Sequence, residues 1–424
     1  MTRLVALTLC ALLCLSPVRA QVALSSETDL GNANRAYADL VSRFWEGPAA
    51  TGRLTLAATG LPIPSGLTAR TANCIGCYWG IGMGINALYA HWKLNGSADA
   101  LTRLKAVWRW TQATISLANA GTCGPIAGSN GTAQDDIAWN ANAYLQLYEA
   151  SGDANALAYA KAALDCAWGR WYDTSIGGGL WYDDSRTCKT SYQGPYAVAA
   201  LRYSQLTPVS ADQVAYLARA VSLEASFQAS LTISRTDALY WVNVADDGSG
   251  APVFAGGNPC SPRTVSAASY QAIVGKAASS TFLAGNMAIA ALDAMLANAP
   301  GVSASQAVAY RARAVATAQS IYGTERIGAV LMNDRDAFTN GWGAYHYVTQ
   351  VLPLLSASGA ADAKTILATA RSVMRNARNA DATYSGDWDG PPIKWNASPA
   401  YGLDVSSNAA IWPIVAASLP GATR

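Results

Sequence analysis

The chain has 424 residues, of which 51% are hydrophobic and 13% are charged, which excludes an intrinsically disordered protein and predicts a sizeable folded core. Its 29 basic and 27 acidic side chains nearly balance. Because no strong electrostatic field results, we expect neither nucleic acid nor a membrane surface as a partner, and a ligand of little net charge fits better.

The first twenty residues have the features of a secretory signal peptide. Arg3 precedes a short apolar run, and the segment ends in the small-residue pattern Val18-Arg19-Ala20. We therefore expect residues 1–20 to be removed and the mature protein to be secreted or periplasmic. Because residues 21–424 contain no linker rich in Pro, Gly or Ser, they are expected to form a single domain.

Six cysteines follow this leader, at positions 74, 77, 123, 166, 188 and 260. An even number in an oxidising compartment predicts disulfide bonds, although the spacing leaves their pairing open. The Cys74-Ile-Gly-Cys77 motif is also typical of zinc or redox sites. The chain holds just two histidines, His91 and His346, and no second Cys-x-x-Cys motif, which favours a structural role over a metal site. We expect no metal and no cofactor.

Ala-rich stretches with helical periodicity recur along the chain and are joined in pairs by short polar loops. The five loops are NGSAD at 95, SGDAN at 151, TPVSAD at 207, APGVSAS at 299 and SASGAAD at 356. Residues 136–150 and 154–171, for example, read as one antiparallel pair. A sixth pair forms if 32–45 packs beside 405–417, which closes the array into a ring. Twelve helices in six hairpins predict an all-α fold, the (α/α)6 barrel.

The long connections between these pairs are expected to gather at one end of the barrel. They are residues 46–74, 118–133, 172–191, 229–280, 322–336 and 379–403. Within them, 239–244 and 252–254 predict a small β-hairpin. Long ordered loops are usually functional, and these combine Gly, Trp, Tyr and Asp as a sugar-binding cleft does. The alternative is that the aromatic residues simply pack the loops against the barrel.

Two adjacent acids, Asp135 and Asp136, open one predicted helix, whose N-cap we assign to Thr132. A single acid there can serve the helix alone, by completing a capping box and complementing the helix dipole. The second acid is left over. Neighbouring helical residues diverge by about 100°, so the two carboxylates can flank a sugar at the ~5 to 5.5 Å separation of retaining glycosidases. Mutual repulsion and unequal burial would then separate their pKa values.

Three sequence blocks around this pair resemble glycoside hydrolase family 76, the endo-acting α-1,6-mannanases. They are QDDIAW at 134–139 with YEASGD at 148–153, IGGGLW at 176–181, and CKTSYQGP at 188–195. The resemblance implies an (α/α)6 barrel, a retaining mechanism and a mannan-type substrate, with Asp135 as nucleophile and Asp136 as general acid/base. Downstream the pattern departs from the family, since SYQA at 269–272 and DAFTNG at 336–341 replace its usual residues.

The resemblance and the aromatic clusters together give the candidate substrate-binding residues, which are Trp139, Trp181, Tyr182, Lys189, Gln193, Tyr270, Gln271, Asp336 and Trp342. For Lys189, the alternative is a surface ion pair. The Tyr345-His346-Tyr347 sequence suggests a rival acid/base site, as in lyases and epimerases on similar barrels. His91 is expected at the opposite end, which leaves His346 without a histidine partner.

The sequence therefore predicts a secreted retaining glycoside hydrolase that cleaves α-1,6-linked mannan or a related α-linked cell-wall polysaccharide. Two alternatives remain open: a polysaccharide lyase or other carbohydrate-active barrel enzyme, and a non-catalytic glycan-binding relative. The expected partner is a polysaccharide or oligosaccharide, and we expect a monomer.

Overall fold

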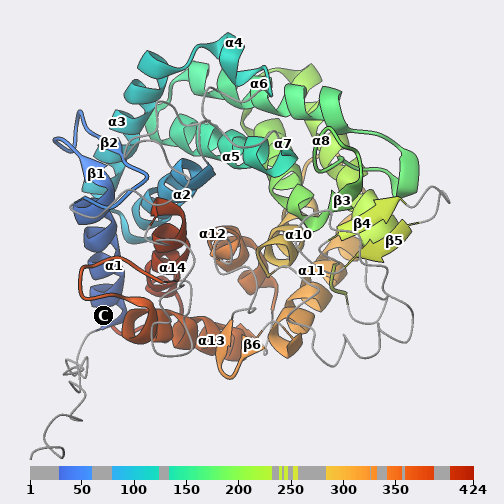
Figure 1. Ribbon diagram of the computed structural model, residues 1–424. Helices are drawn as coiled ribbons and strands as arrows, with labels where there is room; N and C mark the ends of the chain where they lie inside the picture. The colour runs from blue at the N-terminus through green and yellow to red at the C-terminus, as the bar shows by residue number, and fades with distance from the viewer. Residues whose placement is uncertain are drawn as a thin grey trace, which may run out of the picture.

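In the computed structural model, the helices form two concentric rings (Figure 1). The structure describes residues 28–59, 79–123, 133–231, 238–240, 243–246, 252–255, 283–324, 326–331, 341–355, 359–385 and 402–424. The inner ring consists of α2 (Trp79–Asn95), α5 (Gln134–Ser151), α7 (Gly194–Leu206), α10 (Leu283–Leu296), α12 (Ala344–His346) continued by η6 (Tyr347–Val351), and α14 (Leu403–Ala416). The outer ring consists of α1 (Asp29–Phe44), α3 (Ala98–Thr114), α6 (Ala154–Trp171), α8 (Ser210–Ser226), α11 (Ala304–Thr324) and α13 (Gly359–Ser372). The predicted (α/α)6 barrel is confirmed.

Burial follows from the position of each helix in the two rings. Every residue of α10 and α14 is buried, as expected for helices with protein on all sides. Outer helices such as α8 keep one exposed face. The described residues also include shorter helical turns, namely α4 (Leu117–Ala120), η2 (Ser175–Gly177), η3 (Ser191–Gln193), η4 (Phe227–Leu231), η7 (Leu352–Leu354) and η8 (Val373–Ala377).

The first and last helices close the ring, as predicted for residues 32–45 and 405–417. Helix α1 packs against α14 and touches α13. The carboxylate of Asp29 accepts hydrogen bonds from Arg371 Nε at 2.9 Å and from the Thr423 backbone N–H at 2.8 Å. One buried acid at the start of α1 thus joins α13 to the C-terminal segment.

The inner helices run parallel to one another. Residues near the start of one inner helix contact residues near the start of the next, in the pairs Gly82–Trp139, Gly84–Leu403, Gly194–Ala288 and Gly343–Met287. The N-termini of these helices therefore gather at one end of the barrel. Described parts of two long connections also lie there, since Ala57 pairs with Gly402 just before α14, and Tyr182 contacts Gln134 at the start of α5.

A small antiparallel sheet extends the predicted hairpin. Its strands β3 (Cys188–Thr190), β4 (Asn243–Asp246) and β5 (Pro252–Ala255) pair in the order β3-β4-β5. The hairpin is confirmed, but its first strand begins at Asn243 and not at 239. Leu239 and Tyr240 are buried, and the Tyr240 N–H donates to Asn286 Oδ1 of α10 at 3.0 Å. Two further hairpins pair β1 (Trp45–Glu46) with β2 (Arg53–Leu54) and β6 (Arg326–Ile327) with β7 (Val330–Leu331).

The described cysteines form disulfides, as predicted for an exported chain. Cys123 is bonded to Cys166, and Cys188 is also disulfide-bonded. The positions 74, 77 and 260, like the expected leader 1–20, lie outside the described residues. Within the described part of the chain, no group of three or more His, Cys, Asp or Glu side chains is arranged to hold a metal ion. No helix described there combines the length and apolarity needed to cross a bilayer.

Closure of the inner ring requires a glycine at position 341, in the turn before α12. A Cβ atom there would lie 2.0 Å from the carbonyl oxygen of Asn408 in α14. Because backbone cannot yield as a flexible side chain does, we expect Gly341→Ala to lower the free energy of unfolding by about 1–3 kcal/mol. Gly323→Ala, near the end of α11 in open space, is the matched control and should be neutral or stabilise by up to about 1 kcal/mol. Urea denaturation measures both, and equal effects would contradict the packing described.

Candidate active site

The two adjacent acids lie in the first turn of α5, at the end of the barrel where the inner helices begin. The N-cap is Ala133, which makes no side-chain capping bond, so the prediction that Thr132 caps this helix is wrong. The backbone carbonyl of Tyr182 instead accepts the Gln134 N–H at 2.8 Å. A carbonyl from a neighbouring loop therefore satisfies the first N–H group of the helix.

The carboxyl groups of Asp135 and Asp136 are densely surrounded by protein, although both residues keep some exposed surface. Burial raises the pKa of Asp135 to about 6, against the opposing effect of hydrogen bonds from the backbone N–H groups of both residues. Burial and the negative charge of Asp135 raise the pKa of Asp136 well above its usual value. The pair is thus asymmetric, and Asp135 is the acid that ionises first. Its Oδ1 is buried without a hydrogen-bond partner among the described residues.

Tyr182 is a predicted substrate-binding residue whose pKa is affected by the charges of the two acids. The charge of Asp135, followed by burial, raises the pKa of Tyr182 far above its usual value. Its phenol therefore stays protonated and can donate a hydrogen bond. The ring of Tyr192, which the sequence analysis did not select, lies 6.4 Å from the ring of Tyr182 between centroids.

Trp139 of α5 and Trp342 of the turn before α12 pack against each other. Their ring centroids are 4.4 Å apart at an interplanar angle of 73°. Both indoles are almost fully buried, with 2% and 3% of their surface exposed. Trp139 follows Asp136 by about one helical turn. Because both indoles are buried, they offer no exposed face on which a sugar ring could stack.

Lys189 has neither of the roles considered for it from sequence. Its side chain is completely buried, and its Nζ donates to Asp173 Oδ1 at 3.1 Å and to the carbonyls of Asp173 and Ser175 at 3.2 and 2.6 Å. It also lies 4.8 Å from the ring centroid of the buried Trp181. Lys189 therefore supports the turn under Trp181, and its ammonium is neither in a surface ion pair nor available to a sugar hydroxyl.

Gln193 likewise shapes the loop and does not face a ligand. Its Oε1 accepts the Leu180 N–H at 2.6 Å, and its Nε2 donates to the Thr190 carbonyl at 3.0 Å. A Cβ at Gly179 would lie 2.7 Å from that Oε1, and Gly179 has φ +102°, which strongly favours glycine. The glycine-rich loop is thus held by Gln193 so that the residues after it reach the start of α5.

Three predicted substrate-binding residues, Tyr270, Gln271 and Asp336, lie outside the described residues. The two histidines have different neighbours. His91 stacks on Tyr37 with a centroid distance of 4.1 Å, whereas His346 packs beside Tyr345 and is buried.

Gln134, directly before the pair, is a residue that the sequence analysis did not select. Its side chain is completely buried, and both amide atoms lack a hydrogen-bond partner among the described residues. A buried amide without partners is costly and is uncommon in cores. Its position directly before the two acids, in the QDDIAW block, was the feature that could have marked it as a site residue. That block does not indicate whether the side chain is buried.

We expect the desolvated pair to reduce the stability of the fold at neutral pH. A carboxyl whose folded-state pKa is raised favours folding at low pH, and this contribution is lost as pH rises through the folded-state pKa. Replacing both acids with neutral amides, Asp135→Asn with Asp136→Asn, should therefore raise the free energy of unfolding at pH 7 by on the order of 2 kcal/mol. Thermal unfolding at pH 7 and pH 3.5 measures the difference, which should shrink at the lower pH. A double variant no more stable than the wild type at pH 7 would contradict the burial described.

No protein-family model matches the chain, and no curated protein matches it in sequence. Solved structures do match. The glycoside hydrolase family 76 α-1,6-mannanase of Salegentibacter sp. is 14% identical with a TM-score of 0.66, covering 91% of this chain and 98% of its own. A family 76 mannosidase of Bacteroides thetaiotaomicron is 15% identical with a TM-score of 0.66, covering 92% and 98%.

A third match holds a ligand. It is an inactive variant of the Salegentibacter mannanase, altered at two consecutive aspartates, in complex with α-1,6-mannotetrose, at 14% identity, a TM-score of 0.67 and coverage of 92% and 99%. At these identities the similarity is one of fold. The chain described here therefore has the (α/α)6 fold of glycoside hydrolase family 76 structures, over nine tenths of its length.

Proposed function

We propose that the protein is a divergent member of glycoside hydrolase family 76, a retaining hydrolase of α-1,6-linked mannan or a related α-linked cell-wall polysaccharide. The observation that carries the proposal is the adjacent pair Asp135 and Asp136, desolvated and electrostatically asymmetric, at the barrel end where the inner helices begin. A relative in fold is inactive when two consecutive aspartates are altered, and it binds an α-1,6-mannooligosaccharide. The disulfide between Cys123 and Cys166 supports a secreted or periplasmic location.

In the proposed first step, Asp135 is the nucleophile. Its pKa is the lower of the two, and the backbone N–H groups and the dipole of α5 stabilise its ionised form. A carboxylate oxygen of Asp135 bonds to the anomeric carbon as the bond to the leaving oxygen breaks. Asp136, still protonated, gives its proton to that leaving oxygen. The products of this step are a glycosyl ester of Asp135 and the released alcohol end of the glycan.

In the second step, Asp136 is the base. Its carboxylate takes a proton from a water molecule whose oxygen bonds to the anomeric carbon, and the ester to Asp135 breaks. Two inversions give net retention of configuration. We assign to the protonated phenol of Tyr182 the donation of a hydrogen bond to the nucleophile or to the sugar.

A lyase mechanism through His346 is less well supported. The residue is 3% exposed, and burial, followed by the positive charge of Arg202, lowers the pKa of His346 well below its usual value. Such an imidazole is a weak base with little access to a polymer.

We expect Asp135→Asn and Asp136→Asn each to lower kcat by several hundredfold or more on α-1,6-mannooligosaccharides, because each step needs both groups. Asp212→Asn, on the outer helix α8, is the control and should keep full activity. Product chromatography gives the rates, and NMR gives the anomer first released, which should be α. Ultraviolet-absorbing products from uronic-acid polymers would indicate a lyase, and binding without release would indicate a non-catalytic relative.

Azide rescue separates the two roles. With an activated aryl α-mannoside substrate, Asp135→Ala plus azide should give the inverted β-glycosyl azide, because azide enters from the side of the missing nucleophile. Asp136→Ala plus azide should give the retained α-glycosyl azide. The opposite assignment of products would exchange the roles of the two residues.

The pH dependence of kcat/KM follows from the same two pKa values. Below about pH 6 Asp135 is protonated and cannot attack, so activity should rise with pH through this region. At higher pH Asp136 loses the proton that the leaving group requires, so activity should fall again. Initial rates on α-1,6-mannotetraose from pH 3 to 10 test the profile. Maximal activity below pH 4 would contradict the burial of the nucleophile.

A further inference from the structure

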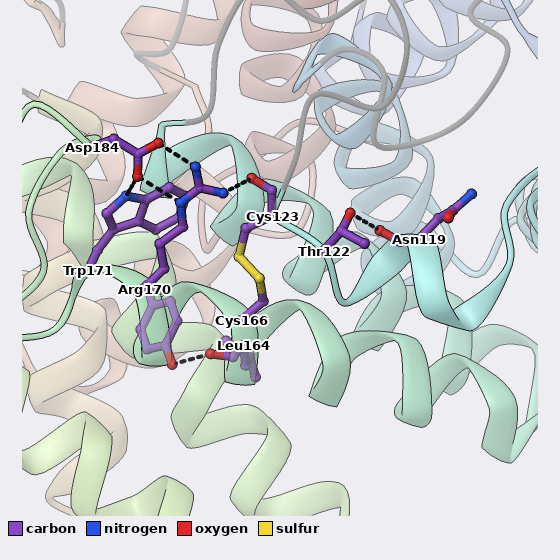
Figure 2. The surroundings of a disulfide bond; sticks show 9 residues. Asn119, Thr122, Cys123, Leu164, Cys166, Arg170, Trp171 and Asp184 are labelled. Atoms are coloured by element: carbon purple, nitrogen blue, oxygen red, sulfur yellow. Dashed lines mark hydrogen bonds and ion pairs between the residues drawn. A yellow bond between two sulfur atoms is a disulfide. The ribbon is translucent and has the colours of Figure 1, made fainter.

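The last two turns of α6 hold two chain segments, one at Cys123 and one at Asp184 (Figure 2). Cys166 is disulfide-bonded to Cys123. One turn later, Arg170 Nη1 donates to the Cys123 carbonyl at 2.9 Å, and its Nε donates to Asp184 Oδ1 at 2.7 Å. Arg170 Nη2 contacts the other oxygen of Asp184, and Trp171 Nε1 donates to Oδ1 at 3.0 Å. We call Cys123, Cys166, Arg170 and Asp184 the α6 clamp.

Each segment held by this clamp is linked to the start of α5, one along the chain and the other through a backbone hydrogen bond. Cys123 precedes the N-cap Ala133 by ten residues of chain. Asp184 lies two residues after Tyr182, whose carbonyl caps α5 through the Gln134 N–H at 2.8 Å. The phenol of Tyr182 lies within the electric field of Asp135. A shift of the Asp184 segment is therefore transmitted to the aspartate pair through one backbone hydrogen bond and one charge interaction.

The side chains of the clamp are better suited to fixing the positions of its two segments than to raising the free energy of unfolding. The side chains of Arg170 and Asp184 are 34% and 51% exposed, and ion pairs at such exposure contribute little to the free energy of folding. A guanidinium, however, presents its donors in a rigid planar fork, so it fixes two partners at set angles. Cys123 has φ +44°, a left-handed conformation that a non-glycine residue keeps only when its surroundings impose it. The disulfide and the hydrogen bond from Arg170 are two contacts that hold Cys123 in place.

We propose that the α6 clamp is a positioning device for the hydrolysis proposed above, on which this inference rests: Arg170 and the Cys123–Cys166 bond set the place of the α5 N-terminus and of Tyr182. Neither group touches the substrate. Arg170 is thus a positioning residue, and its removal should change the rate of the chemical steps more than the binding of glycan.

Kinetics and hydrogen exchange on the full chain test this proposal together. We expect Arg170→Gln and Asp184→Asn each to lower kcat by about 10- to 100-fold with little change in KM, since small displacements of catalytic groups have effects of this size. Arg170→Lys should restore only part of kcat, because one ammonium lacks the planar fork that serves both the Cys123 carbonyl and Asp184. The variant Cys123→Ser with Cys166→Ser should show the same split between kcat and KM.

Lys161→Gln is the matched control. Lys161 is on the same helix, in an exposed ion pair with Asp165 at 2.6 Å, and contacts neither segment of the clamp. Its kcat and KM should equal those of the wild type. In hydrogen exchange followed by mass spectrometry, the clamp variants should exchange faster in the peptide that spans the first turn of α5, whereas the control should not.

The two readouts separate failure of this inference from failure of the proposed function. If the wild type hydrolyses mannan but the Arg170 variants keep kcat and the α5 peptide keeps its protection, the positioning role is overturned and the hydrolase stands. If no glycan is hydrolysed by the wild type, the function fails, and faster exchange at α5 in the clamp variants still supports the structural link. Unchanged exchange overturns that link in either case. Equal losses in the Lys161 variant would reduce the effect to a general loss of charge on α6.

Discussion

The desolvation of two neighbouring carboxyl groups at the start of α5 is the constraint on which the candidate site depends. Water would keep both acids ionised, whereas the protein around Asp135 and Asp136 opposes their charge. Backbone N–H groups and the helix dipole stabilise the ionised carboxylates in place of water, and they stabilise Asp135 more than Asp136. The resulting inequality lets one helix turn hold an ionised and a protonated carboxyl at the same pH, as double displacement requires.

The barrel makes this arrangement possible because its inner helices run parallel. Their N-termini collect at one end, and there the described loop that follows α6 reaches the start of α5. In that loop, the carbonyl of Tyr182 accepts the first N–H of the helix, and the charge of Asp135 raises the pKa of the Tyr182 phenol. Lys189 and Gln193 hydrogen-bond to the backbone of Ser175 and Leu180, in the turns that precede this loop. Arg170 of the α6 clamp holds the same loop from the outer helix, through its hydrogen bond to Asp184.

Much of the fold follows from sequence periodicity. Short polar loops between Ala-rich stretches predicted the helical hairpins, and the match between the first and last stretches predicted closure of the ring, because both are local patterns repeated along the chain. The paired acids were also identified from sequence. The fates of Lys189 and Gln193 were not predicted, because a polar residue in a loop is exposed or buried according to tertiary contacts that no local pattern contains. For the same reason Thr132 looked like the N-cap although a distant carbonyl supplies the cap.

The measurement that tests the central claim most directly is identification of the covalent intermediate. An activated mannoside that forms the glycosyl ester quickly and hydrolyses slowly should label the wild-type protein once. Tandem mass spectrometry of the peptide that spans residues 134–139 should then place the sugar on Asp135, with no label in the Asp135→Asn variant. A label on Asp136 or elsewhere, or glycan hydrolysis that inverts the anomeric configuration, would contradict the assignment of a buried, ionised Asp135 as the nucleophile.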